Sequence, residues 1–343
     1  MRNRRALAGF ATVLALVLGV GVLGGCAGPE PTLDDPLAAL PAGAVFASAG
    51  PTAAEDTSCD PRRSLPAIAS YRPQSGFLTI GVDQADATMS HWDPVTQTFA
   101  GFNIDLVKQI AQSIWPDGHP LDHLHFVVVP PGAGGFDALL RHEVDIVATS
   151  LTATCSRGKR VAFSDDTLDS GQSILVRKDA SGAPRFDSLA ALRGQRVCAA
   201  ADTTSIDNLF NFGGLRVVRV DNVIDCLVML EQDQVAAVST DHNILLGFQG
   251  MTDDTIVPDT PSNDRAACSH HDATPCPWVS DEPHAFALRP DDTQLLGFIN
   301  HVLESPAGRT AWTASHDRWL PEHHDDGDPQ PPPPYQSTTW PFP

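Results

Sequence analysis

The segment from Ser150 to Phe163, SLTATCSRGKRVAF, combines hydroxyl groups with a cation in a short turn. Arg157 lies five residues after Thr152, and both follow a short apolar run that is typical of a strand. A guanidinium is planar, always charged and able to hold both oxygens of a carboxylate at once. We therefore expect Arg157 to bind a carboxylate, with Thr152 and Ser150 donating single hydrogen bonds beside it. The simpler alternative is that Arg157 is one exposed charge among 22 Lys and Arg residues.

Three further motifs accompany this turn in a defined order. GFNIDLVKQIA precedes it, and LRGQRVCAAADTTS and QVAAVSTDHNILLGF follow it. Together with T-x-T-x-x-R and V-x-F-S in the turn, they resemble the motifs of bacterial family 3 solute-binding proteins, which capture amino acids. The resemblance covers about Gly76 to Leu320. The cysteines and the N-terminus look most like those of the glutamine-binding lipoproteins of actinobacteria.

The resemblance implies further ligand contacts. Thr204 and Ser205 would hold the same carboxylate as Arg157, from a second lobe. Asp241, after the strand-like VAAVST, would receive the α-ammonium of an amino acid, and Asp83 would contact the ligand side chain. An Arg and an Asp at the two ends of an amino-acid backbone would form a zwitterion clamp.

Each of these segments also has a purely structural interpretation. Residues 202–205, DTTS, precede an apolar helical segment and are first of all a helix N-cap. The cap does not exclude a binding role, because free N–H groups at a helix start hold an anion. Asp241, taken alone, is typical of a turn that follows a strand.

Three positions depart from the family pattern: Asp86 in place of an aromatic residue, Ala200 in place of the Lys of many glutamine binders, and Asp202 in place of Gly. Trp92, like His91 or Met89, is a candidate to close over the ligand side chain, and each could equally be simple packing. Side-chain specificity therefore stays open among Gln, Asn, Glu and Asp.

The N-terminus has the parts of an export signal. Three Arg within the first five residues precede the apolar run 6–22, and Leu-Gly-Gly leads directly to Cys26. We expect a lipoprotein signal peptide over residues 1–25, with lipidated Cys26 attaching the chain to the outer face of the membrane. A permanent transmembrane anchor is the alternative. Residues 26–58, rich in Ala, Pro and Gly, read as a flexible tether.

Charge excludes some partners. The formal net charge is −20, and removing the three Arg of the signal gives 19 − 42 = −23. Such an acidic chain is a poor candidate for nucleic acid or for anionic lipid surfaces. The Pro-rich tail, residues 321–343, is expected to be disordered; a metal site there could use His323, His324, Asp325 and Asp326.

Six cysteines remain after Cys26 is set aside, an even number in an exported chain. Of fifteen possible connectivities we expect three disulfides: Cys198 with Cys226, Cys268 with Cys276, and Cys59 with Cys155. The alternative for one cluster is a zinc site made of Cys268, His270, His271 and Cys276.

Alternating strand and helix patterns predict an α/β fold of two lobes. Val107, Ile110, Ala111 and Ile114 recur at helical spacing, and strand patterns such as Leu78–Val82 precede and follow. We expect a two-lobe periplasmic-binding-protein (Venus flytrap) fold, with two mainly parallel sheets joined by a two-strand hinge. Lobe 1 would span residues 59–172 and 283–320, and lobe 2 residues 173–282.

These features favour a monomeric, lipid-anchored binding protein without cofactor or metal. It would pass a polar amino acid to an ABC permease or present it to a membrane sensor. Related folds include dehydratases, but no G-x-S-x-G, H-E-x-x-H or P-loop pattern is present, so we expect no enzyme. A metal-binding lipoprotein is the third class considered, because of the thirteen His residues, which include His119, His123 and His125.

Overall fold

The computed structural model describes residues 45–46, 65–116, 118–258 and 280–320. The predicted signal peptide, Cys26, the tail and most of the tether lie outside these ranges, as do Cys59, Cys268 and Cys276. In the ranges described, no helix is both long and apolar enough to span a bilayer.

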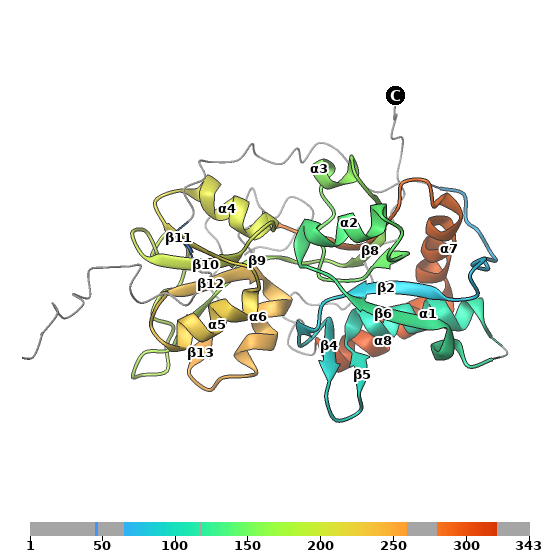
Figure 1. The fold of residues 1–343 in the computed structure, drawn as a ribbon. Coiled ribbons are helices and arrows are strands. Elements are labelled where there is room, and N and C mark those ends of the chain that lie inside the picture. The colour runs from blue at the N-terminus through green and yellow to red at the C-terminus, as the bar shows by residue number, and fades with distance from the viewer. Residues whose placement is uncertain (1–44, 47–64, 117, 259–279, 321–343) are drawn as a thin grey trace, which may run out of the picture. The chain divides into compact units, whose positions relative to one another are not determined.

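Lobe 1 is built on a mixed sheet with the strand order β6-β2-β7-β15-β8 (Figure 1). Its strands are β2 (Leu78–Val82), β6 (Leu124–Val128), β7 (Ile146–Val147), β8 (Ala162–Leu168) and β15 (His284–Leu288). β2 pairs in parallel with β6 and β7, as the alternating pattern predicts. β15 returns from the other lobe and pairs antiparallel with β7 and β8.

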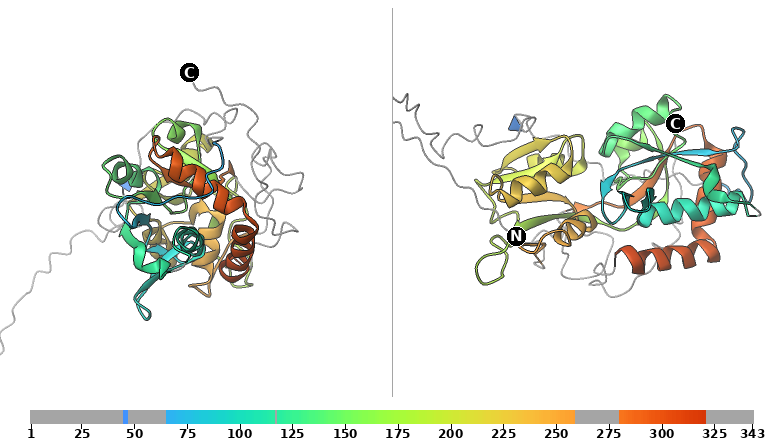
Figure 2. Two further views of the ribbon diagram at one scale, coloured as in Figure 1. Left: turned by 90° about the vertical axis from the view of Figure 1, so that its right-hand side faces the viewer. Right: turned by 60° about the horizontal axis from the view of Figure 1, so that its bottom comes forward.

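Helices pack on both faces of this sheet. They are α1 (Phe102–Ile114), α2 (Gly135–Leu140), the short α3 (Cys155–Gly158), α7 (Thr293–Glu304) and α8 (Pro306–Trp319). Val107, Ile110, Ala111 and Ile114 of α1 are all buried, which confirms the predicted apolar face. They share one core cluster with α7 and α8, and Figure 2 shows these C-terminal helices in red against this lobe.

Lobe 2 is built on a second mixed sheet with the order β1-β11-β10-β12-β9-β13, in which β14 also pairs with β9. Its strands are β1 (Val45–Phe46), β9 (Gly171–Arg177), β10 (Arg196–Ala200), β11 (Arg216–Val220), β12 (Ala237–Asp241), β13 (Thr255–Ile256) and β14 (Ser280–Asp281). β10 pairs in parallel with β11 and β12. Its helices are α4 (Thr204–Phe212), α5 (Val223–Glu231) and α6 (His242–Gln249).

Two apolar clusters stabilise lobe 2, one on each face of its sheet. α5 and α6 contribute Leu227, Leu230 and Phe248 to one cluster, and α4 contributes Leu209 to the other. A disulfide joins Cys198 on β10 to Cys226 on α5, which confirms this predicted pair. Cys155 is also disulfide-bonded, and its predicted partner lies outside the described residues.

The two lobes are connected where β8 continues into β9 and where β14 leads into β15. These segments lie side by side and antiparallel: Ser280 pairs with Gln172, and His284 pairs with Leu168. Between the two pairs, the Glu282 N–H donates to the Ser170 carbonyl at 2.7 Å. The hinge is therefore a hydrogen-bonded two-strand connection, and its two segments cannot bend independently.

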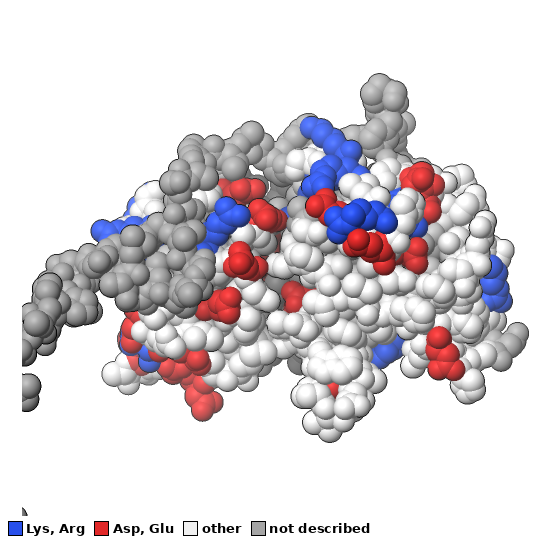
Figure 3. Space-filling model, in the orientation of Figure 1, with Lys and Arg blue, Asp and Glu red and all other residues white. Residues whose placement is uncertain are grey.

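Charges on the face drawn in Figure 3 are mixed rather than segregated. Basic side chains gather over α2 and α3 beside acidic ones. In this part of the chain Arg141 pairs with Glu143, and Arg160 pairs with Asp137. These two arginines are therefore each paired with an acidic neighbour.

Candidate ligand-binding site

A cavity of about 40 Å³ lies where the strand ends of the two lobes meet. Lobe 1 contributes Asp83, Asp86, Pro131, Gly132, Thr149, Ser150, Thr152 and Arg157, and lobe 2 contributes Ala200, Thr203, Thr204, Ser205, Val223, Thr240, Asp241 and Ile244. The structure thus brings together seven of the eight residues predicted to contact a ligand. The eighth, Trp92, is not among the lining residues.

Trp92 lies on a small hairpin sheet made of β3 (Ala85–Asp86), β4 (Ser90–Asp93) and β5 (Thr98–Ala100). Its side chain is 44% exposed and packs edge-to-face against Phe99, with ring centroids 5.2 Å apart. Met89 is fully buried in the core of lobe 1, and His91 packs against Trp319. None of the three candidates for closing over the ligand side chain lines the cavity.

Arg157 lies in α3, which begins three residues after Thr152, and Thr152 forms an isolated antiparallel bridge with His284. The Thr154 hydroxyl caps this helix by accepting from the Arg157 N–H at 3.3 Å. The Arg157 side chain is buried, and its Nη1 donates to the Thr152 carbonyl at 2.8 Å. This bond holds the guanidinium over the turn at the cavity wall.

The opposite wall is the start of α4. Thr203 is its N-cap, and the Thr203 hydroxyl accepts from the Ile206 N–H at 3.3 Å. Thr204 and Ser205 are the first helical residues, so the helix start, with its free N–H groups, faces the cavity. Both interpretations of the DTTS segment therefore apply at once: it caps a helix and lines the cavity.

Asp202 precedes this cap with φ 57°, in the left-handed region that favours Gly. This backbone conformation explains why the family pattern has Gly at the position of Asp202. Asp202 also marks a close approach of the two lobes, because a Cβ on Gly132 would lie less than 3 Å from its carbonyl oxygen.

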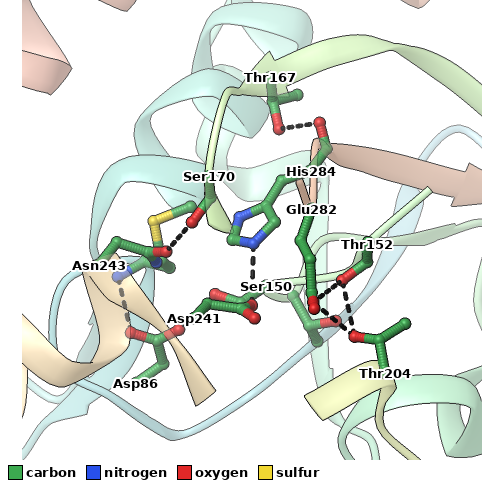
Figure 4. Close-up of polar contacts among 12 residues, drawn as sticks. Asp86, Ser150, Thr152, Thr167, Ser170, Thr204, Asp241, Asn243, Glu282 and His284 are labelled. Atoms are coloured by element: carbon green, nitrogen blue, oxygen red, sulfur yellow. Dashed lines mark hydrogen bonds and ion pairs between the residues drawn. The ribbon is translucent and has the colours of Figure 1, made fainter. Parts of the chain in front are cut away.

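Glu282 was missed in the sequence interpretation and lies directly behind the two threonines (Figure 4). Its Oε2 accepts from the Thr152 hydroxyl at 3.1 Å and from the Thr204 hydroxyl at 2.5 Å. Its Oε1 accepts from Asn208 Nδ2 at 2.8 Å and from the Ser280 hydroxyl at 2.6 Å. Burial, followed by the charge of Asp241, raises the pKa of Glu282 to about 7. The only sequence signal was an acidic residue just before the apolar strand HAFAL.

Asp241 lies at the end of β12 and is also supported from the hinge. His284 Nε2 is 2.9 Å from Asp241 Oδ2, and both side chains are buried. Within the described residues His284 Nδ1 has no hydrogen-bond partner, so the ring is held through its Nε2 contact with Asp241. A carboxylate with one oriented oxygen can receive an ammonium group at the cavity.

Two further carboxyl groups line the lobe 1 side of the cavity. Asp86 Oδ2 accepts from the Ser150 hydroxyl at 2.5 Å, and Asp86 Oδ1 accepts from the Thr88 and Met89 N–H groups. The Ser150 hydroxyl predicted to face a ligand thus donates to Asp86 in this structure. Burial raises the pKa of Asp86 to about 6 and also raises the pKa of Asp83.

Charged groups of opposite sign lie on two sides of the cavity. Its positive wall is Arg157 with the start of α4, and its negative wall contains Asp241, Asp83 and Asp86. Within the part of the chain that the structure describes, no three His, Cys, Asp or Glu side chains form a group that could hold a metal ion. Of the histidines considered for metal binding, His123 stacks on Trp115 and His125 stacks on Phe77.

Comparisons with known proteins place the chain in a family. Residues 78–322 match the family described as bacterial extracellular solute-binding proteins, family 3. The chain is 26% identical over 232 residues to the ABC transporter glutamine-binding protein GlnH of Bacillus subtilis, covering 67% of this chain and 76% of that protein. It is 23% identical over 236 residues to the glutamate-binding protein GluB of Corynebacterium glutamicum, covering 67% and 74%.

The fold is also shared with solved structures. A mutant of arginine-bound ArgBP from T. maritima superposes with a TM-score of 0.55 at 28% identity, covering 67% of this chain and 95% of that chain. This likeness confirms the predicted two-lobe architecture.

Proposed function

Because this chain belongs to the bacterial extracellular solute-binding proteins, family 3, we propose that it captures a polar amino acid between its lobes. The observation that carries the proposal is the cavity itself, to which lobe 1 contributes Arg157 and lobe 2 contributes Asp241. A ligand whose carboxylate contacts Arg157 and the start of α4, and whose ammonium contacts Asp241, links both lobes. Such a ligand binds the closed form best and shifts the protein toward it.

The lobe 1 carboxyl groups favour particular side chains. Asp83 and Asp86 accept hydrogen bonds, so they complement the NH₂ of an amide better than a second carboxylate. Of the four candidates, Gln and Asn therefore fit better than Glu and Asp. Named relatives bind glutamine, glutamate and arginine, and arginine also offers donors to these acids. Glutamine is our first candidate and arginine the second.

Location and partners follow from the N-terminus and the family. Lipidated Cys26 attaches the protein to the outer face of the membrane, where the closed lobes are presented to an ABC permease or to a membrane sensor. The relatives named above are binding proteins, and we assign no catalytic residue. The protein acts as a monomer without a cofactor.

A thermal-shift screen of the purified protein against the twenty amino acids, followed by calorimetry on the hits, tests this function. A ligand at about a hundred times its dissociation constant adds about 2.7 kcal/mol to the free energy of unfolding, which raises the melting temperature measurably. A screen in which no amino acid raises the melting temperature would contradict the proposed function.

Arg157→Ala tests the carboxylate site. Removing a charge-assisted, bidentate contact costs about 3 kcal/mol, so the dissociation constant of the amino acid found in the screen should rise about a hundredfold. Arg160→Ala is the matched control, because Arg160 lies three residues away and pairs only with exposed Asp137 among its ion pairs in the described chain. Equal affinities for the two variants, measured by calorimetry, would overturn the assignment of Arg157.

A further inference from the structure

Glu282 lies outside the cavity lining but contacts two residues that form it. It follows β14 in the hinge, and its Oε2 receives hydrogen bonds from Thr152 of lobe 1 and Thr204 of lobe 2 (Figure 4). One buried carboxylate oxygen therefore joins the two threonines that were expected to donate to the ligand carboxylate. The two hydroxyl oxygens are 3.3 Å apart.

A threonine hydroxyl has one proton to donate and two lone pairs to accept with. When Glu282 is ionised, both protons point at its Oε2, and only lone pairs remain for the cavity. Lone pairs repel a ligand carboxylate, and the buried negative charge behind them repels it further. When Glu282 is protonated, its own O–H donates to one of the hydroxyls. At least one hydroxyl proton then becomes free to turn toward the ligand.

We infer that Glu282 is a positioning residue that sets the hydrogen-bond polarity of the Thr152–Thr204 pair, so that binding of the ligand carboxylate takes up one proton at Glu282. This inference rests on the proposed function, since it requires an amino-acid carboxylate at this pair. In this step the ligand and one proton from solvent bind to the protein in which Glu282 is ionised. The resulting complex contains neutral Glu282. No covalent bond forms or breaks apart from the O–H bond of the carboxyl group.

The groups around Glu282 support this behaviour. Its contacts from α4 and β14 are the neutral Asn208 and Ser280, so neither compensates its charge. The charge of Asp241 on β12 acts on Glu282 with the same sign, and Asp241 Oδ2 lies 2.9 Å from His284 Nε2 of β15. The cation of this region, Arg157 of α3, binds the Thr152 carbonyl on the cavity side. Burial and Asp241 place the pKa near 7, where proton uptake matters at ordinary pH.

Calorimetry across pH tests the inference on the full protein. The probe is L-glutamine or, if another amino acid binds more tightly in the screen above, that amino acid. In the wild type the dissociation constant should rise about tenfold per pH unit above about pH 7. Buffers of different ionisation enthalpy should report uptake of about one proton per ligand. Glu282→Gln keeps the shape of the side chain but removes its charge, so its affinity should be nearly independent of pH up to about pH 9 and tighter than wild type there.

Glu143→Gln is the matched control, because Glu143 is exposed and pairs with Arg141 on the surface. It should keep the pH profile of the wild type. A wild-type affinity that is constant across this pH range, or that increases with pH, overturns the inference and leaves the proposed function intact. A wild type that binds none of the twenty amino acids overturns both. If Glu282→Gln does not fold, the wild type alone still tests the inference. The measured quantity is then the number of protons that the wild type takes up on binding, from calorimetry in buffers of different ionisation enthalpy.

Discussion

At the residue scale, the site depends on which atoms already have hydrogen-bond partners. Thr152, Thr204 and Ser150 were expected to donate to a ligand, yet their hydroxyls donate to Glu282 and Asp86. A hydroxyl that donates to a buried carboxylate presents acceptors to its other neighbours. The residue types were therefore sufficient to find residues that line one cavity, but not to predict the direction of their hydrogen bonds.

Asp202 gives a prediction at the same scale. It occupies the left-handed region, and its ion pair with Arg219, at 3.5 Å and on the surface, contributes little. Asp202→Gly relieves the strained conformation and should raise the free energy of unfolding by about 0.5–1 kcal/mol, measured by urea denaturation.

Asp233→Gly provides the comparison. Asp233 also has a positive φ, but its two carboxylate oxygens pair with Arg177 and Arg185. Its replacement loses those contacts and should stabilise less. A larger gain at Asp233 than at Asp202 would contradict this account.

At the element scale, short helices place the polar groups of the site. α3 holds Arg157 after one strand of lobe 1, and α4 directs its free N–H groups at the cavity from lobe 2. Each helix is preceded by a threonine N-cap in extended conformation. The extended segment therefore ends at the threonine, and the helix begins at the next residue. The caps therefore position cavity-lining groups as well as stabilise helices.

Thr203→Ala separates these two roles. Loss of the α4 cap should lower the free energy of unfolding by about 1 kcal/mol and also weaken amino-acid binding, because the N–H groups at the cavity lose their fixed direction. Ser305→Ala removes the equivalent cap of α8, where the Ser305 hydroxyl accepts from the Gly308 N–H at 3.0 Å.

The α8 variant should lose similar stability with unchanged affinity, since neither Ser305 nor any residue of α8 lines the cavity. Denaturation and calorimetry on both variants provide the test. Equal effects on affinity would show that the α4 start has no special role in binding.

At the scale of the whole molecule, binding requires the lobes to approach closely. Gly132 has φ 58°, and a Cβ there would lie 2.4 Å from the Asp202 carbonyl oxygen of the other lobe. Gly132→Ala should therefore hinder closure and raise the dissociation constant at least tenfold. Small-angle scattering should show less compaction on adding the amino acid than in the wild type.

Gly182→Ala is the matched control for this effect. Gly182 also has a positive φ, of 88°, but a Cβ there meets nothing within 4 Å. Gly182→Ala introduces backbone strain but no contact between the lobes. This variant should therefore lose some stability and keep its affinity for the amino acid. If both variants bind alike, closure does not depend on Gly132.

Much of the molecule could be predicted from sequence because the relevant patterns are local. Helical spacing in α1, strand alternation in β2 and the cap before α4 each depend on neighbouring residues, and all are present in the structure. The motifs also located seven residues that line one cavity and a disulfide between β10 and α5. The family motifs are also local runs of sequence, and they indicated the two-lobe fold.

Only the tertiary structure decided how these groups are used. Thr152, Thr204 and Glu282 are far apart in the chain, and no local pattern shows that their oxygens share hydrogen bonds. Burial, which raises the pKa of Glu282 and Asp86, also results from packing of distant segments. Trp92, a plausible ligand contact by type, faces Phe99 because its hairpin pairs that way. Residue types and spacing determine which groups can reach a cavity, whereas contacts between distant segments determine their charge and hydrogen-bond direction there.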